Sequence, residues 1–483
     1  MARINTNVPA IVAQRTLRQT HRDLQISLER LSSGLRINRG ADDPAGLINS
    51  EALRAEIAGV NKAISNSQRA INIIATTEGA LNEVAALLVD IQGLIVETAN
   101  NAALSDDEKR ANQLQIDSAI ESITRIANTT TFAGRKLLNG SLDYVTSGVN
   151  PAHLAGVTVT GAQFGNASFI PVTVNVTTSA QKAELFWRHS AVPAGQRIAI
   201  EIQGAKGVTT FEWDAGVTMD QIIRAINAES GATGVTAASA TPGNASSGIV
   251  LRSVGYGSDQ FVSVRDLAGG TPFVPEDAAG NPKLRDEGRD AVALINGATA
   301  RGRGLELMLN TRTLDLSVVL NEAFNTVGVT EFAIIGGGAL FQLGPDVSTN
   351  QQVNLGVQSV AATKLGNTNV GFLSQIMEGG AFEAMGTPAQ QNRASEIVNE
   401  AIRQVAVLRG RLGAFERNTL QTNINSLTIT MENLTASESA IRDTDFAAET
   451  SRLTRNQILV NAGTSVLALA NQTAQSVLGL LGG

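Results

Sequence analysis

The stretch that most constrains the fold is the last one, Phe446 to Gly483, which carries no Asp, Glu, Lys or Arg after Arg455. Apolar and uncharged polar residues recur there at the a and d spacing of a coiled coil. These positions are Leu453, Gln457, Val460, Thr464, Leu467, Asn471, Ala474, Leu478 and Leu481. Further apolar residues, such as Ile458 and Leu459, lie beside this seam, so the apolar face is wider than a two-stranded coil needs. The stretch therefore predicts a helix that is covered on more than one side.

Three interpretations of this helix compete. Polar residues from Asn461 to Ser476 interrupt any run of about 18 apolar residues, which argues against a transmembrane helix. An ordinary core helix and a helix buried by copies of the same chain both remain open. A matching apolar helix at the other end of the chain would favour burial between copies.

Composition narrows the possible functions. Of the 483 residues, 17% are charged, against the usual ~25%, so much of the surface is available for protein contact. The net charge of -7 shows no excess of basic residues, which proteins use to bind nucleic acid or an anionic membrane. The absence of cysteine excludes disulfides, thiolate zinc sites and thiol nucleophiles. The N-terminal residues lack the apolar core of a secretory signal, so if the protein leaves the cell, it does not use that route.

The N-terminal third predicts the matching helices. From Ala10 the chain has helical periodicity, with one apolar face made by Leu17, Leu24, Leu28, Leu31 and Leu35. A break follows, in which we expect Gly40 to end the first helix, Asp42 and Asp43 to cap the next, and Pro44 to occupy its first turn.

Two further helices and a hairpin are predicted next. A helix from Ala45 to about Asn100 keeps a near-heptad register, and the capping box Ser105–Glu108 opens another amphipathic helix. The Asn139-Gly140 pair predicts a small β-hairpin between Phe132 and Asn139.

The middle of the chain predicts short strands. Alternating Ile198, Ile200 and Ile202 begin one α+β module. A second module is expected from paired strands around Asn296-Gly297, with a helix from Leu316 to Phe324. The charged stretch around Asn281-Pro282 is the expected boundary between the two.

Helical periodicity returns from Ala389 and stops at Asp443-Thr444-Asp445, where Asp443 or Asp445 can cap the last helix. The order of elements is thus mirrored about the middle and brings the two chain ends together. We predict a mainly α fold with a β-rich middle, in which long antiparallel coiled-coil helices from both termini flank inserted α+β modules. The expected domains are 1–40 with 444–483, 41–145 with 386–443, 146–275 and 276–385.

Four segments resemble a known family. Ser27–Asn38 with Asp42–Gly46, and Ile441–Glu449 with Ala462–Gln472, are similar to the N- and C-terminal signatures of bacterial flagellin. The resemblance covers roughly half the chain. It implies a structural subunit that polymerises into the extracellular flagellar filament, the propeller for swimming motility, with the terminal helices lining the inner tube. It also implies export through the flagellum's own type III apparatus and an export chaperone on the C-terminal helix. Hook-associated junction and cap proteins are the other implied partners, and nucleic acid, membrane insertion and a cofactor are not expected.

The expected self-assembly interface combines both termini. It comprises Leu24, Leu28, Leu31, Leu35, Leu453, Val460, Leu467, Asn471, Leu478 and Leu481. Asn471 either fixes the register as a buried polar seam residue or faces a wet lumen.

The segment that ends at Leu94 resembles the stretch that a vertebrate Toll-like receptor recognises in many flagellins, but it departs from the family pattern at two positions. Asp90 and Gly93 stand where a basic and an acidic residue usually occur. A reversed charge at a contact centre weakens binding, so we expect weak or absent recognition by that receptor.

Rival functions receive less support. The chain has three histidines, none beside an acidic partner at ligand spacing, and no phosphate-binding Gly-x-x-x-x-Gly-Lys loop, so we expect no enzymatic activity. A hook–filament junction protein, which resembles flagellin at both ends, is the alternative. An adhesin role of the middle modules could coexist with either.

Overall fold

The computed structural model describes residues 6–100, 103–165, 167–189, 191–192, 197–241, 244–267 and 273–481, without side chains at 244–246 and 473–481. The chain divides into two compact units. One comprises Met1–Arg69, Gln342–Gln351 and Asn418–Gly483, and the other comprises Ala70–Phe341 and Gln352–Arg417. The predicted division of the terminal helices near residue 40 thus differs from this boundary, which falls within the second long helix.

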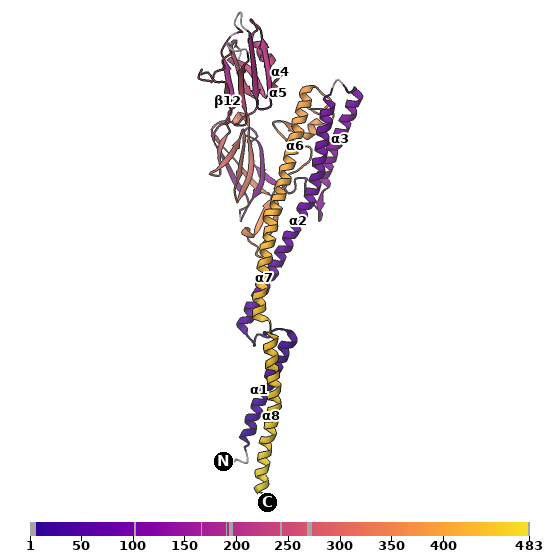
Figure 1. The fold of residues 1–483 in the computed structure, drawn as a ribbon, viewed down its shortest axis with the longest axis vertical. Coiled ribbons are helices and arrows are strands. Elements are labelled where there is room, and N and C mark those ends of the chain that lie inside the picture. The colour runs from indigo at the N-terminus through magenta and orange to yellow at the C-terminus, as the bar shows by residue number, and fades with distance from the viewer. Residues whose placement is uncertain are drawn as a thin grey trace. The chain divides into compact units, whose positions relative to one another are not determined.

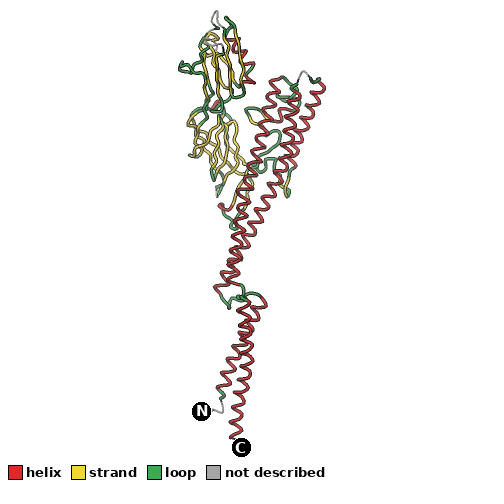
Figure 2. Tube along the Cα trace, in the orientation of Figure 1, coloured by secondary structure: helices red, strands yellow, loops and turns green. Residues whose placement is uncertain are grey.

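Long helices come from both ends of the chain and short strands from its middle (Figure 2). The long helices are α1 (Val8–Ser33), α2 (Pro44–Thr98), α3 (Asp106–Thr129), α6 (Pro388–Phe415), α7 (Thr422–Arg442) and α8 (Phe446–Leu481). A π-helical segment, Glu416–Gln421, joins α6 to α7 without a break in the helical path. The predicted fold class, helices from both termini around a β-rich middle, is confirmed.

In the second unit, the C-terminal part of α2 lies beside α3 and α6 (Figure 1). Buried residues on all three helices keep alternating spacings of three and four, the signature of coiled-coil packing. They include Ala70, Ile74, Thr77, Leu81, Val84, Leu88, Ile91 and Ile95 on α2, Gln113, Ile116, Ile120 and Ile123 on α3, and Ala394, Val398, Ala401, Val405, Leu408 and Leu412 on α6. The Gln92 side chain donates to Ser395 Oγ at 2.9 Å and ties α2 to α6. The predicted heptad helices are confirmed.

The helix boundaries follow local chemistry. The predicted capping box is present: Ser105 N donates to Glu108 Oε2 at 2.8 Å, and Glu108 N donates to Ser105 Oγ at 3.3 Å. The predicted end of the first helix at Gly40 is wrong. That helix ends at Ser33, because Gly34 takes the left-handed conformation (φ 74°) that closes a helix C-terminus, and its N–H bonds Arg30 O.

The predicted hairpin exists, but its turn does not lie at Asn139-Gly140. Strands β1 (Thr131–Phe132) and β2 (Arg135–Lys136) pair around Ala133-Gly134, both at positive φ. Asn139 instead accepts the N–H of Ser141 in a local side-chain turn.

An eight-stranded sheet forms the first β module, with the strand order β3-β17-β5-β13-β14-β15-β16-β4. Its strands are β3 (Tyr144–Ser147), β4 (Leu154–Ala162), β5 (Ile170–Thr178), β13 (Val292–Ile295), β14 (Ala298–Arg303), β15 (Glu306–Asn310), β16 (Leu314–Leu320) and β17 (Gly328–Gly337). Its core is built from inward-facing side chains such as Val172, Val174, Leu316, Val318 and Phe332.

A second module is inserted between β5 and β13. It contains a three-stranded sheet, β6-β10-β9, and a four-stranded sheet, β12-β11-β7-β8, around one core with Trp187, Ile200 and Ile222. The elements are β6 (Glu184–Trp187), β7 (Ile198–Gly204), β8 (Val208–Trp213), α4 (Met219–Ala228), α5 (Ser230–Thr233), β9 (Val235–Thr241), β10 (Asn244–Ser253), β11 (Phe261–Asp266) and β12 (Arg285–Glu287).

The predicted sequential order of the modules, 146–275 followed by 276–385, is therefore wrong. Strand β5 pairs with both β13 and β17, so one sheet uses residues from both sides of that boundary. Asn281-Pro282 is a turn inside the inserted module, where Asp277 N donates to Asn281 O at 2.8 Å.

Two predicted elements, a hairpin and a helix, fall within the eight-stranded module. The paired strands predicted around Asn296-Gly297 are confirmed as β13 and β14. The predicted helix from Leu316 to Phe324 is wrong. Residues Leu314–Leu320 form β16, because Leu314, Leu316, Val318 and Leu320 alternate inward with the period of a strand.

The remaining short elements lie between β16 and α6 in the sequence. They are η1 (Glu322–Phe324), β18 (Ala339–Gln342), η2 (Thr349–Gln351), β19 (Gln352–Leu355), β20 (Gly366–Asn367), β21 (Gly371–Phe372) and η3 (Leu373–Ile376).

Candidate functional site

Helices α1 and α8 lie side by side and antiparallel in the first unit (Figure 1). Asn7 Nδ2, at the start of α1, donates to Ala470 O at 2.9 Å, and Arg30, near its end, faces Glu449 at 3.8 Å. Both helices therefore contribute one continuous seam, with its residues at heptad spacing. The seam residues, buried or half-buried, are Ala10, Ala13, Leu17, Thr20, Leu24, Ser27 and Leu31 on α1 and Leu453, Asn456, Val460, Gly463, Leu467 and Ala470 on α8.

The breaks before α2 and α8 are bonded to each other. Arg36 N donates to Arg442 O at 2.7 Å, and Thr444 N donates to Gly34 O at 2.9 Å. Leu35 and Asp443 form an antiparallel bridge at the same place. These bonds join the two breaks into one hydrogen-bonded junction between residues 34–36 and 442–444, which we call the clasp.

Carboxylates organise the N-terminal break. Asp42 Oδ2 accepts the N–H groups of Asn38 and Arg39 at 3.1 and 2.9 Å, and Asp43 Oδ1 accepts that of Gly46 at 2.9 Å. Pro44 is the first residue of α2, where its missing N–H costs nothing.

The C-terminal break uses the same chemistry. Asp445 Oδ1 accepts the N–H groups of Ala447 and Ala448 at 2.9 and 3.0 Å, while Asp443 Oδ2 accepts the Ser439 hydroxyl at 2.6 Å. Glu449 is buried in the first turn of α8, where the helix dipole favours a negative charge, and pairs with Arg452 at 3.3 Å.

Outside the seam, both helices expose large apolar side chains, which we call the outer apolar face. Their exposed fractions run from 47% at Val12 to 62% at Ile458. The outer apolar face comprises Val8, Ile11, Val12 and Leu28 on α1 and Ile458, Leu459, Val466 and Leu469 on α8. Exposed apolar surface of this kind on a soluble protein marks sites of contact with other proteins.

The predicted interface residues other than Asn471 lie in four different places. Leu24, Leu31, Leu453, Val460 and Leu467 lie in the seam within one chain, and Leu35 lies half-buried in the clasp. Leu28 lies on the outer apolar face. Leu478 and Leu481 lie outside the residues whose side chains the structure describes.

Asn471 does not lie in the seam that the sequence predicted for it. The seam passes through Asn456, Gly463 and Ala470, one residue before the predicted Gln457, Thr464 and Asn471, and Asn471 is exposed. Asn456, Gly463 and Ala470 are small or polar, so no hydrophobic signal marks them in the sequence. Close helix approach selects small residues: a Cβ built on Gly463 would lie 3.1 Å from Leu17 Cδ1.

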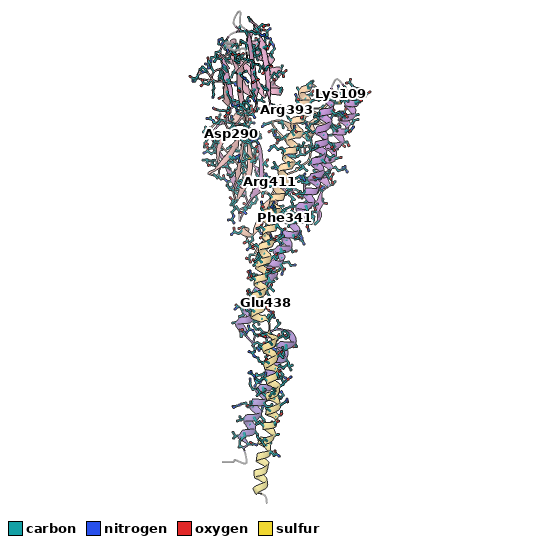
Figure 3. All side chains as sticks on the ribbon, viewed as in Figure 1. Lys109, Asp290, Phe341, Arg393, Arg411 and Glu438 are labelled. Atoms are coloured by element: carbon teal, nitrogen blue, oxygen red, sulfur yellow. The ribbon has the colours of Figure 1, made fainter. Side chains whose placement is uncertain are left out.

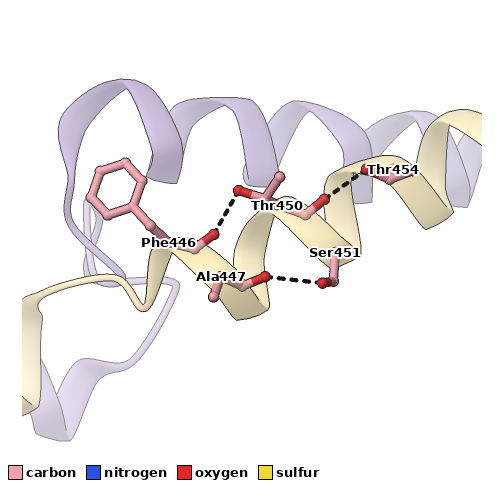
Figure 4. Close-up of a pocket in the computed structure, with 5 residues that line it drawn as sticks. All are labelled: Phe446, Ala447, Thr450, Ser451 and Thr454. Atoms are coloured by element: carbon pink, nitrogen blue, oxygen red, sulfur yellow. Dashed lines mark hydrogen bonds between the residues drawn. The ribbon is translucent and has the colours of Figure 1, made fainter.

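A shallow groove follows the first turns of α8 (Figure 4). Phe446, Ala447, Thr450, Ser451 and Thr454 line it. Its hydroxyls are engaged within the helix, since Thr450 donates to Phe446 O, Ser451 to Ala447 O and Thr454 to Thr450 O. The groove therefore presents apolar surface and satisfied hydroxyls rather than a nucleophile.

In the second unit, the segment before Leu94 lies on α2. Asp90 and Gly93 are exposed and Leu94 is half-buried. No group of three or more His, Cys, Asp or Glu side chains that could hold a metal ion occurs among the residues described.

Comparison with known proteins matches two regions to one family. Residues 4–143 match the bacterial flagellin N-terminal helical region, and residues 395–481 match the bacterial flagellin C-terminal helical region. Flagellin A of Vibrio cholerae is 30% identical over 480 residues, which cover 99% of each chain. The chain belongs to the bacterial flagellins. Polar flagellin C of Vibrio parahaemolyticus is 29% identical over 478 residues, again covering 99% of each chain. Among solved structures, FliC of Burkholderia pseudomallei aligns with 73% of this flagellin and 99% of its own chain at 14% identity and a TM-score of 0.24.

Family membership establishes the function at this level. This flagellin is a structural subunit that polymerises into the bacterial flagellar filament, an extracellular structure that serves motility. Nothing in the comparisons favours the alternative of a hook–filament junction protein.

Proposed function

We propose that the outer apolar face of α1 and α8 is the contact through which copies of this flagellin assemble into the filament. The observation that carries the proposal is that these residues stay exposed although α1 and α8 already cover each other's seam. Each such side chain contributes about 1.5–3 kcal/mol when fully buried. Eight of them supply enough free energy to hold neighbouring subunits together after the cost of association.

The contact is head-to-tail rather than self-complementary. A heterologous contact whose rotation does not close produces an open helical polymer, as a filament requires. Within this proposal, the predicted seam residues Leu24, Leu31, Leu453, Val460 and Leu467 act indirectly, because they hold the two helices so that the outer apolar face is continuous. Leu28 acts directly, and Leu478 and Leu481 extend the same helix. Asp42, Asp43, Pro44, Asp443 and Asp445 set the direction in which the pair leaves the clasp.

The test compares two lysine substitutions of exposed valines. Val466→Lys places a charge on the outer apolar face, and Val347→Lys, at an 88% exposed position in the loop before β19, is the matched control. Seeded elongation followed by light scattering should fall at least tenfold for Val466→Lys and stay unchanged for Val347→Lys. Circular dichroism of the monomers should show equal helix content. Elongation of Val466→Lys at the wild-type rate would refute the proposal.

The same face explains the partners implied by the family resemblance. An exposed apolar α8 needs cover before assembly, which fits an export chaperone on that helix, and hook-associated junction and cap proteins would meet the subunits at the two filament ends. Export through the flagellum's own type III apparatus, without a signal peptide, belongs to the same proposal. The net charge of -7 gives no support for nucleic acid as a partner.

No enzymatic activity and no membrane insertion form part of this proposal. Helix α2 is the one candidate span among the described residues, by length and composition only. The heptad of buried residues on α2 is the pattern of coiled-coil packing, in which about two residues in seven face the partner helix.

The proposed function has a consequence for recognition by a vertebrate host. Asp90 and Gly93 lie exposed on α2, where a receptor would meet them. With an acidic residue and no side chain at these two places, we infer weak or absent activation of the Toll-like receptor that reads this segment.

A further inference from the structure

At one edge of the eight-stranded sheet, the outward surface carries little charge. Three neighbouring strands at one edge of the sheet, in the order β3-β17-β5, carry exposed apolar residues in adjacent positions. Val145 on β3 is 53% exposed, Ile335 on β17 is 48% exposed, and Phe169, just before β5, is 52% exposed. We call these three residues the apolar row.

The strand register brings the apolar row together. Ile334 pairs with Ile170, so the continuing register sets Phe169 opposite Ile335. On the other side, β17 has a register shift between Ile334 and Gly336, and Gly336 pairs with Val145. The side chains of Ile334 and Tyr144 point into the core, and those of Ile335 and Val145 point outward.

The surroundings of the apolar row carry a single charged residue. The outward positions next along these strands are Ser147, Ala333 and Pro171, followed by Glu331 and Thr173. Glu331 is the single charged residue among them, and its carboxylate accepts the Thr173 hydroxyl at 3.3 Å. The solvent side of an antiparallel sheet ordinarily alternates to polar residues. This departure indicates a surface built for contact with another apolar surface.

We propose that the apolar row contacts a second copy of this flagellin in the filament. Polymerisation makes identical chains the obligatory neighbours of each module, and a tethered neighbour needs only a small contact because its effective concentration is high. A nearly uncharged surface offers no attraction to an ionic partner. The apolar row also includes edge strand β3, whose unpaired side is suited to meeting another chain.

The test uses the absence of cysteine from the chain. Ile335→Cys introduces a single thiol in the apolar row. Val327→Cys is the matched control, since Val327 is 72% exposed just before the other end of β17. Maleimide labelling is measured in the monomer and in assembled filaments of each variant. Polymerisation should slow labelling of Ile335→Cys at least tenfold and leave that of Val327→Cys within twofold.

Two results would overturn the proposal. Equal labelling of Ile335→Cys in monomer and filament would leave the row free for a partner from outside the filament. Equal protection of both thiols would show general shielding rather than a contact at this row. As a second measurement, Val145→Lys should form filaments that depolymerise at lower temperature than wild type, whereas unchanged thermal depolymerisation would contradict the contact. Filament formation itself depends on α1 and α8, so this result is distinguishable from a failure of the outer apolar face.

Discussion

At the scale of single residues, Gly46 shows how tightly the N-terminal break is packed. A Cβ built there would lie 2.4 Å from Asp43 Oδ2 and 2.7 Å from Ile37 Cδ1, and Ile37 is fully buried. Gly46→Ala should therefore destabilise the subunit by about 1–3 kcal/mol through overpacking and a weakened cap. Gly93→Ala, on an open surface of the same helix, should stabilise it by about 0.5–1 kcal/mol. Urea unfolding of the two monomers measures both effects, and equal stability of the variants would contradict this account.

Recognition by the Toll-like receptor also belongs to the residue scale. A receptor reporter assay should give a weak or absent response to the wild-type monomer. The double substitution Asp90→Arg with Gly93→Glu restores the charge pattern that flagellins usually carry there and should raise the response at least tenfold. Asp107→Arg with Gly79→Glu is a control with the same chemistry at exposed positions elsewhere on α3 and α2, and it should leave the response unchanged. A strong wild-type response would refute the inference.

At the scale of elements, Asp290 joins the two β modules (Figure 3). It accepts the N–H groups of Gly304 and Ser258 at 2.7 and 3.0 Å and the Ser258 hydroxyl at 2.6 Å. Burial acts to raise the pKa of Asp290, but these hydrogen bonds, helped by Arg303, hold it below its usual 3.8. Folding lowers the pKa of Asp290, so the hydrogen bonds of its carboxylate stabilise the folded protein above pH 3.8. This contribution to the free energy of unfolding is lost as the pH falls below that value.

Asp290→Asn should therefore lower the stability of the β modules by about 1 kcal/mol at pH 6. The difference from wild type should shrink as the pH falls below 3.8, since the native carboxylate is then protonated as well. Asp259→Asn is the control, because Asp259 is 61% exposed and its pair with Arg303 is a surface ion pair of little energetic value. Urea unfolding followed by tryptophan fluorescence measures these differences. A constant difference between pH 6 and pH 3 would exclude the proposed role of the charge.

The elements also show what could be predicted from the sequence. Long helices with apolar heptads were predictable because a stripe such as Leu81, Leu88 and Ile95 has a single compatible period. The strand at Leu314–Leu320 was mistaken for a helix although its apolar residues alternate. On α8, the predicted seam runs through Thr464 and Asn471, whereas the observed seam runs through Gly463 and Ala470. These small residues carry no strong hydrophobic signal in the sequence. Nested modules could not be predicted, since the pairing of β5 with β13 and β17 is a long-range property.

At the scale of the whole molecule, the mirrored order of elements has a direct structural outcome in each unit. Segments from both ends of the chain meet in the first unit, where the clasp joins residues near Gly34 to residues near Asp443. In the second unit, α6 returns beside α2, tied by Gln92 and Ser395. The family motifs at both ends made this organisation predictable, whereas the β modules between them lack motifs of comparable length.

The small residues of the seam have a consequence for the kinetics of polymerisation. Positions such as Ala10, Ser27, Gly463 and Ala470 bury little apolar area, so these positions add little to the pairing of α1 and α8 in a free subunit. Two monomers that meet in solution would then gain too little free energy of association to form a stable nucleus. A subunit that adds to a filament end contacts several assembled subunits at once. Spontaneous polymerisation should accordingly show a long lag phase that a preformed fragment abolishes, which confines growth to existing ends.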